Sequence, residues 1–146
     1  MSKKRDDTCR LYDEIYKNAS MGAGTTAHLL SGKRSKEMNE SLQKQYAEYT
    51  AICKNAQVCM HAHGKEIKKL TAFEKIRTDG GVRMNLLIDD SDSHIAKMLM
   101  NGGTMGVINA QKNLTKYSGA EKEAKALMKR LSDYELSTID VMRTFL

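Results

Sequence analysis

Residues 19–23 read Ala-Ser-Met-Gly-Ala and residues 103–107 read Gly-Thr-Met-Gly-Val, so one short pattern occurs twice, 84 positions apart. Each copy lies within a segment whose apolar residues recur every three or four positions, which is the spacing of one helix face. Each segment is followed by a turn and by another segment of the same kind. The sequence therefore predicts a helical hairpin that is used twice, as an internal repeat.

The first hairpin is expected over residues 7–63. A stop at Ser31 and Gly32 divides it, with Gly32 as a candidate left-handed cap, and Ser35 is placed to begin the second helix. Gly64 is expected to end that helix. The seam of the second helix has the alternating steps of four and three that bundle helices use; it comprises Met38, Leu42, Gln45, Tyr49, Ile52, Ala56, Cys59 and His63.

The second hairpin is expected over residues 93–146, after a long helical connector at residues 64–92. Polar residues at 89–93 favour a helix start there, and Ser118 with Glu121 has the spacing of a capping box. Two stripes follow the helical spacing. They comprise Ile95, Leu99, Gly102, Gly106 and Asn109, and then Ala124, Leu127, Leu131, Tyr134, Thr138, Val141 and Phe145.

Composition agrees with an all-α fold. The 146 residues include no proline and 5% aromatic residues, whereas strands favour aromatic and β-branched side chains. Four amphipathic helices bury their stripes best as a bundle. We therefore predict one domain, residues 1–146, folded as an up-down-up-down four-helix bundle.

The sequence also gives indications of the cellular location and the binding partners. The N-terminal residues lack an apolar stretch, no run approaches the roughly 20 apolar residues of a membrane span, and the three cysteines are too few for a disulfide framework. A cytoplasmic bacterial protein without a membrane partner is expected. The net charge of +6 and short basic clusters interspersed with acids make nucleic-acid binding an unfavoured interpretation.

Five glycines inside the predicted helices need a compensating role, because each costs about 1 kcal/mol relative to alanine. They are Gly22, Gly24, Gly102, Gly103 and Gly106. Close packing between the first and third helices is the favoured explanation, and room for a ligand between helices is the alternative. No strand precedes them and no Gly-Lys-Ser/Thr follows, so neither a P-loop nor a dinucleotide-binding turn fits.

Four-helix bundles often hold metals in their cores. No histidine has a glutamate three positions before it, so the Glu-x-x-His pattern of di-iron bundles is missing. Antiparallel folding is instead expected to gather Cys9, Cys59, His63 and His94 at one end, where thiolates and imidazoles could bind a divalent metal such as zinc or iron. The competing interpretation is that these residues are packed in the core. Cys59 and His63 could touch, but no orienting group for nucleophilic catalysis is evident, so no enzyme is predicted.

Residues 84–99 and 101–106, with Asn-Ala-Ser-Met-Gly at 18–22, resemble an uncharacterised family of small helical-bundle proteins of Gram-positive anaerobes. The resemblance covers nearly the whole chain. It implies a ferritin-like four-helix bundle and a metal-binding role, with His94 as the best candidate ligand within the matched segment.

These observations favour a metal- or small-ligand-binding bundle without catalysis. The alternative is a structural or protein-interaction module that forms a homo-oligomer through apolar surface of residues 67–88.

Overall fold

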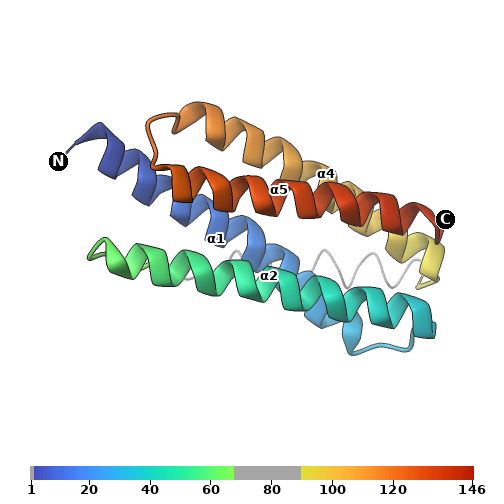
Figure 1. The fold of residues 1–146 in the computed structure, drawn as a ribbon. Helices are drawn as coiled ribbons and strands as arrows, with labels where there is room; N and C mark the ends of the chain where they lie inside the picture. Colours follow the sequence, from blue (N-terminus) through green and yellow to red (C-terminus); the bar gives the residue numbers. More distant parts are fainter. Residues whose placement is uncertain (1, 68–89) are drawn as a thin grey trace.

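The structure is a computed structural model that describes residues 2–67 and 90–146. Within these residues the chain forms α1 (Lys3–Leu30), α2 (Lys36–Ala62), α4 (Asp92–Lys116) and α5 (Lys122–Arg143). Helix α1 packs along α2, α4 packs along α5, and the two hairpins lie against each other (Figure 1). The predicted all-α bundle of two hairpins is confirmed. Most of the expected connector, and with it the proposed self-association surface, lies outside the described residues.

The structure has some of the predicted helix caps and lacks others. Ser35 caps α2 by accepting a hydrogen bond from the Met38 amide, as predicted, and Ser91 begins α4 within the expected polar stretch. Gly64 follows the end of α2 with a φ of 74°, the left-handed conformation that glycine adopts without steric cost. The left-handed cap predicted at Gly32 is wrong, because among the described residues only Gly64 has a positive φ.

The expected capping box at the start of α5 is also wrong. Glu121, not Ser118, occupies the N-cap position, and no side chain of its own caps the helix. Side chains of α1 instead accept hydrogen bonds from backbone amides of this turn. The Glu121 amide donates to Thr8 Oγ1 at 2.8 Å, and the Gly119 amide donates to Asp7 Oδ2 at 3.0 Å. Contacts between residues more than 100 positions apart therefore replace a local cap.

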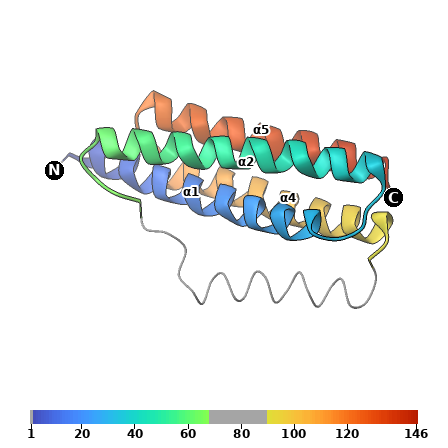
Figure 2. The same cartoon turned by 90° about the horizontal axis from the view of Figure 1, so that it is seen from below.

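The direction of the helices differs from simple alternation. Helices α2 and α4 run the same way, so the end of α2 and the beginning of α4 lie at opposite ends of the bundle (Figures 1 and 2). Hydrogen bonds agree, since the first turns of α1 contact both the end of α2 and the turn that follows α4. The up-down-up-down order is therefore corrected to up-down-down-up.

The core consists of two apolar clusters with a more polar layer between them. One cluster surrounds Tyr12, Ile15 and Ile52, and the other surrounds Leu42 and Met142. Four polar residues are buried at intermediate positions along the helices, namely Thr26, Gln45, Glu135 and Thr138. Burial of polar groups costs free energy unless they are paired, so this middle layer is where a functional site is best sought.

None of the helices in the described part of the chain combines the length and apolarity that crossing a membrane requires.

Candidate functional site

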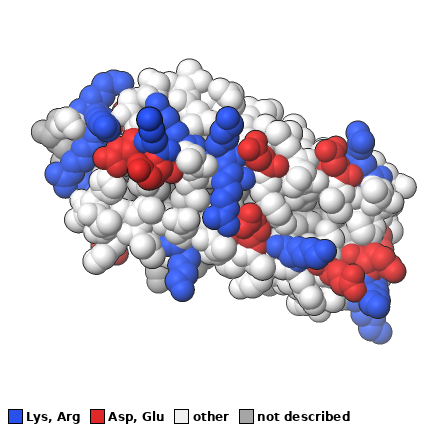
Figure 3. Space-filling model, in the orientation of Figure 1, with Lys and Arg blue, Asp and Glu red and all other residues white. Residues whose placement is uncertain are grey.

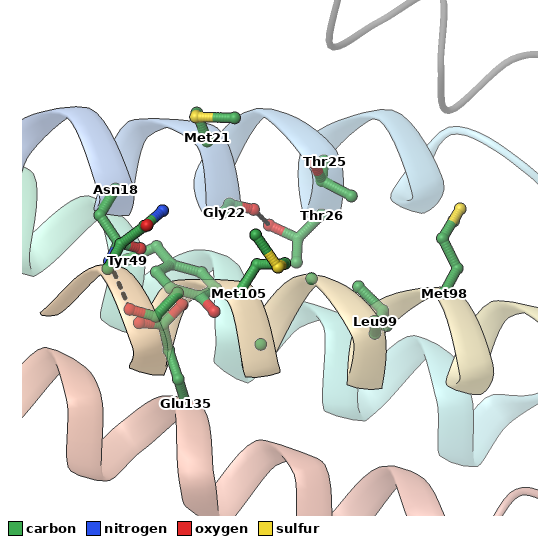
Figure 4. Close-up of a pocket in the computed structure, with 14 residues that line it drawn as sticks. Asn18, Met21, Gly22, Thr25, Thr26, Tyr49, Met98, Leu99, Met105 and Glu135 are labelled. Atoms are coloured by element: carbon green, nitrogen blue, oxygen red, sulfur yellow. Dashed lines mark hydrogen bonds between the residues drawn. The ribbon is translucent and has the colours of Figure 1, made fainter. Parts of the chain in front are cut away.

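A pocket of about 200 Å³ opens in the middle of the bundle, at the polar layer. All four helices contribute to its walls, and both copies of the repeated sequence pattern line it through Met21, Gly22, Met105 and Gly106. The stretch that predicted the two hairpins therefore also lines this pocket between α1 and α4 (Figure 4).

Glycines create space here for side chains from neighbouring helices. A Cβ atom on Gly22 would lie 2.6 Å from the Tyr49 ring, and a Cβ on Gly106 would overlap the carboxyl group of Glu135. A Cβ on Gly103 would meet Ile139 at 3.2 Å. These three glycines accommodate side chains of the hairpin partners, not a direct backbone crossing of α1 with α4 as the sequence suggested.

Gly102 differs from these three. No atom beyond its own helical neighbourhood lies within 4 Å of a Cβ built there, so close packing does not explain this glycine. It lies on the pocket wall instead. The alternative explanation from the sequence, room for a ligand between helices, fits this position better.

Glu135 is the most unusual residue of the pocket. Its side chain comes from α5 and only 3% of the residue is exposed. Its Oε1 atom is buried and has no hydrogen-bond partner. Burial raises the pKa of this carboxyl to about 8, although hydrogen bonds from the side chains of Asn18 and Tyr49 to the carboxyl act in the opposite direction. A buried carboxyl group with one unpartnered oxygen is a recognised mark of a functional site.

The neighbours of Glu135 hold it in place without supplying a positive charge. The Tyr49 ring packs edge-on against Tyr134, with 5.9 Å between ring centroids. Burial, with the nearby Glu135 carboxyl as a further cause, raises the pKa of Tyr49 above its usual range, so this hydroxyl stays neutral. Asn18 donates from Nδ2 to the Gly106 carbonyl at 3.1 Å and so connects α1 with α4 beside the carboxyl.

The rest of the pocket is largely apolar. Figure 4 shows Asn18, Tyr49 and Glu135 gathered toward one end, and Met98 and Leu99 toward the other. Met21 and Met105 also line the space, and they are 44% and 57% exposed. Methionine side chains adapt to ligands of different shape. The pocket therefore combines a flexible apolar wall with one polar end.

The bundle end that was expected to hold a metal contains His63 in a fully hydrogen-bonded state. Its Nε2 lies 3.2 Å from Glu121 Oε2, and its Nδ1 lies 2.9 Å from the Cys59 carbonyl. Arg5 donates to the His63 carbonyl at 3.1 Å. Both ring nitrogens already have partners, so His63 serves as a link between α2 and α5.

The other predicted ligands are not all brought together. Cys9 is buried in the first apolar cluster, and the Cys59 thiol donates to Asn55 Oδ1 at 3.4 Å. His94 lies in the first turn of α4, at the opposite end of the bundle from His63, because α2 and α4 run the same way. The expectation that His94 joins this cluster is therefore wrong. Across residues 2–67 and 90–146, no three His, Cys, Asp or Glu side chains could share a metal ion.

On the face shown in Figure 3, basic and acidic side chains lie next to one another, so this face does not present a continuous basic surface.

Comparison with known protein families, with characterised proteins and with solved structures found no match for this chain. The resemblance inferred from the sequence thus remains a prediction, and the site has to be interpreted from its own chemistry.

Proposed function

We propose that the protein binds a small organic molecule in the pocket between α1 and α4, without catalysing a reaction on it. The observation that carries this proposal is the buried, unpartnered Oε1 of Glu135 beside a 200 Å³ cavity. A buried acceptor without a partner costs about 1–3 kcal/mol, and a ligand that supplies the missing partner recovers that free energy.

The size and chemistry of the pocket set the class of ligand. A 150 Å³ apolar cavity can hold benzene, so this pocket suits a molecule of about eight non-hydrogen atoms. Methionines and Leu99 fit an apolar body, and Glu135 with Asn18 fits one polar group. Binding sites for small molecules have this combination of an apolar lining and a few convergent polar groups.

The lining residues support binding without turnover in one respect. In the described part of the chain they include no cysteine, histidine, serine or lysine, which are common nucleophiles and proton-transfer groups. A metal-binding role, which the resemblance to ferritin-like bundles implies, has less support because His63 is already paired and His94 is distant.

The experiment is a ligand screen by thermal unfolding with small alcohols, amides, acids and amines of four to eight non-hydrogen atoms. A ligand that binds the native state raises the melting temperature by mass action. Gly102→Leu should reduce the rise, because the added side chain starts at the pocket wall and its Cβ position there is open.

Gly24→Leu is the matched control, since Gly24 also has open space around its Cβ position but does not line the pocket. It should respond to ligands like the unmodified protein. If no member of the screen raises the melting temperature, or if Gly102→Leu responds like Gly24→Leu, the proposed site is wrong.

A further inference from the structure

This inference rests on the proposed ligand pocket. The chemistry of the polar end of the pocket indicates which class of small molecule binds there. Glu135 is 3% exposed, and buried carboxyl groups in proteins are almost always paired with a cation or fully hydrogen-bonded. Here Oε1 has neither. The described part of the chain therefore supplies neither a cation nor a hydrogen-bond donor to this oxygen.

No positively charged side chain occurs among the described residues lining the pocket. Helix α1 lines the pocket with Asn18 and Gly22, α2 with Tyr49, and α4 with Gly106 and Asn109. Among the described lining residues Tyr49 is the only other titratable group, and it stays neutral. The bundle thus encloses a carboxyl group, provides space beside it and supplies no counter-charge.

We infer that the ligand is a small primary amine whose protonated amino group pairs with Glu135 Oε1 and whose alkyl or aryl body lies along Leu99 and the methionines. A charge-assisted hydrogen bond from an ammonium group is about twice as strong as one between neutral groups.

Proton uptake and release distinguish this ligand from a neutral one. The empty pocket holds Glu135 mostly protonated below pH 8, since burial raises the pKa of its carboxyl to about 8. An ammonium group must therefore displace this proton. Amine affinity should rise about tenfold per pH unit up to pH 8, and then level off until the amine itself loses its proton near about pH 10.

The test uses three shape-matched pairs in isothermal titration calorimetry: butylamine and butanol, cyclohexylamine and cyclohexanol, and benzylamine and benzyl alcohol. Buffers are free of primary amines and differ in ionisation enthalpy, so that proton release can be counted. At least one amine should bind more tightly than its alcohol and release about one proton at pH 6.5. Its affinity should increase about tenfold between pH 6 and pH 7.

Glu135→Gln keeps the shape of the side chain and removes its charge. It should weaken amine binding by about tenfold or more and should weaken alcohol binding by a smaller factor. Alcohols that bind as tightly as the amines, without proton release, would overturn the amine assignment and leave the proposed pocket intact. If neither class binds the unmodified protein, and no ligand in the thermal screen does, the pocket and the amine assignment both fail.

Discussion

Gly106 lies against Glu135 so closely that a methyl group on the glycine would overlap the carboxyl oxygen Oε2. A helix-weakening residue on α4 and a buried acid on α5 thus form a matched pair. The three atoms nearest to a Cβ on this glycine all belong to Glu135. The pair connects the sequence pattern that predicted the fold with the residue that defines the candidate site.

Gly106→Ala should destabilise the protein by about 1–3 kcal/mol, the usual cost of overpacking a core. In a Glu135→Ala background the same change should become neutral or stabilise by up to about 1 kcal/mol, because only the gain in helix propensity remains. Urea unfolding of the two single variants and the double variant measures this coupling. Equal costs of Gly106→Ala in both backgrounds would contradict the pairing.

Gly22 and Gly24, on the same helix, provide a second comparison. Gly22→Ala should cost about 1–3 kcal/mol, since its Cβ would lie 2.6 Å from the buried Tyr49 ring. Gly24→Ala should stabilise by about 0.5–1 kcal/mol, because its Cβ position is open. In thermal unfolding, the melting temperature of Gly22→Ala should lie below that of the unmodified protein, and that of Gly24→Ala should lie above it. A shared direction would refute the assignment of Gly22 to a tight contact.

Stability should fall with rising pH because of Glu135. Its pKa is about 8 in the folded protein and about 4.3 in an unfolded chain, so the folded state binds the proton more tightly. The resulting stabilisation is fully present below about pH 4.3 and is lost progressively as the pH rises to about 8.

Glu135→Gln removes this titration. The free energy of unfolding of the variant, relative to the unmodified protein, should therefore improve by up to about 1.4 kcal/mol per pH unit between pH 5 and pH 8. Urea unfolding across this range measures the difference, with the exposed Glu37→Gln as control. A constant difference between Glu135→Gln and the unmodified protein would mean that Glu135 is ionised in the fold.

Thr8 should contribute more to the free energy of unfolding than an ordinary helix threonine. Its fully buried hydroxyl accepts from the Glu121 amide and joins α1 to the start of α5. Thr8→Val keeps the shape and should cost about 1–3 kcal/mol, because it leaves that amide without a partner. Thr104→Val is the control, since the hydroxyl of this exposed threonine donates only to the Met100 carbonyl of its own helix. Chemical unfolding that gave both variants the same stability would contradict this role.

Much of the fold could be predicted because local patterns determine it. The seam of α2 is buried from Met38 through Ala56, as the spacing of its apolar residues indicated. Beyond that point the buried residue is Met60, while Cys59 is partly exposed. A straight helix turns away from a seven-residue repeat by about 20° per repeat, so after three repeats the core faces one position later.

The seam of α5 departs from the repeat at the central residue of the site. The repeat placed Tyr134 and Val141 on the seam, whereas Glu135 and Met142 are the buried residues. A glutamate is also expected on the surface from its chemistry. The available signal was the unexplained glycine at position 106, whose missing side chain provides the space that Glu135 occupies.

The predicted metal cluster failed for a different reason. Its membership depended on the direction of α4, which helical periodicity does not determine. His94 is one helix length away from His63 because α2 and α4 run the same way. Tertiary arrangement, not local pattern, thus decides which of the polar residues meet.

The most direct test of the central claim is a two-dimensional ¹H–¹⁵N NMR titration with the tightest-binding member of the ligand screen. The backbone amides of Gly22, Gly103 and Gly106 should shift in a saturable way, and those of Gly32 and Gly64, outside the pocket, should not. The Gly102→Leu variant should show smaller shifts at these amides. Saturable shifts confined to residues away from the pocket, or shifts at the pocket glycines that are undiminished in Gly102→Leu, would contradict a ligand site between α1 and α4.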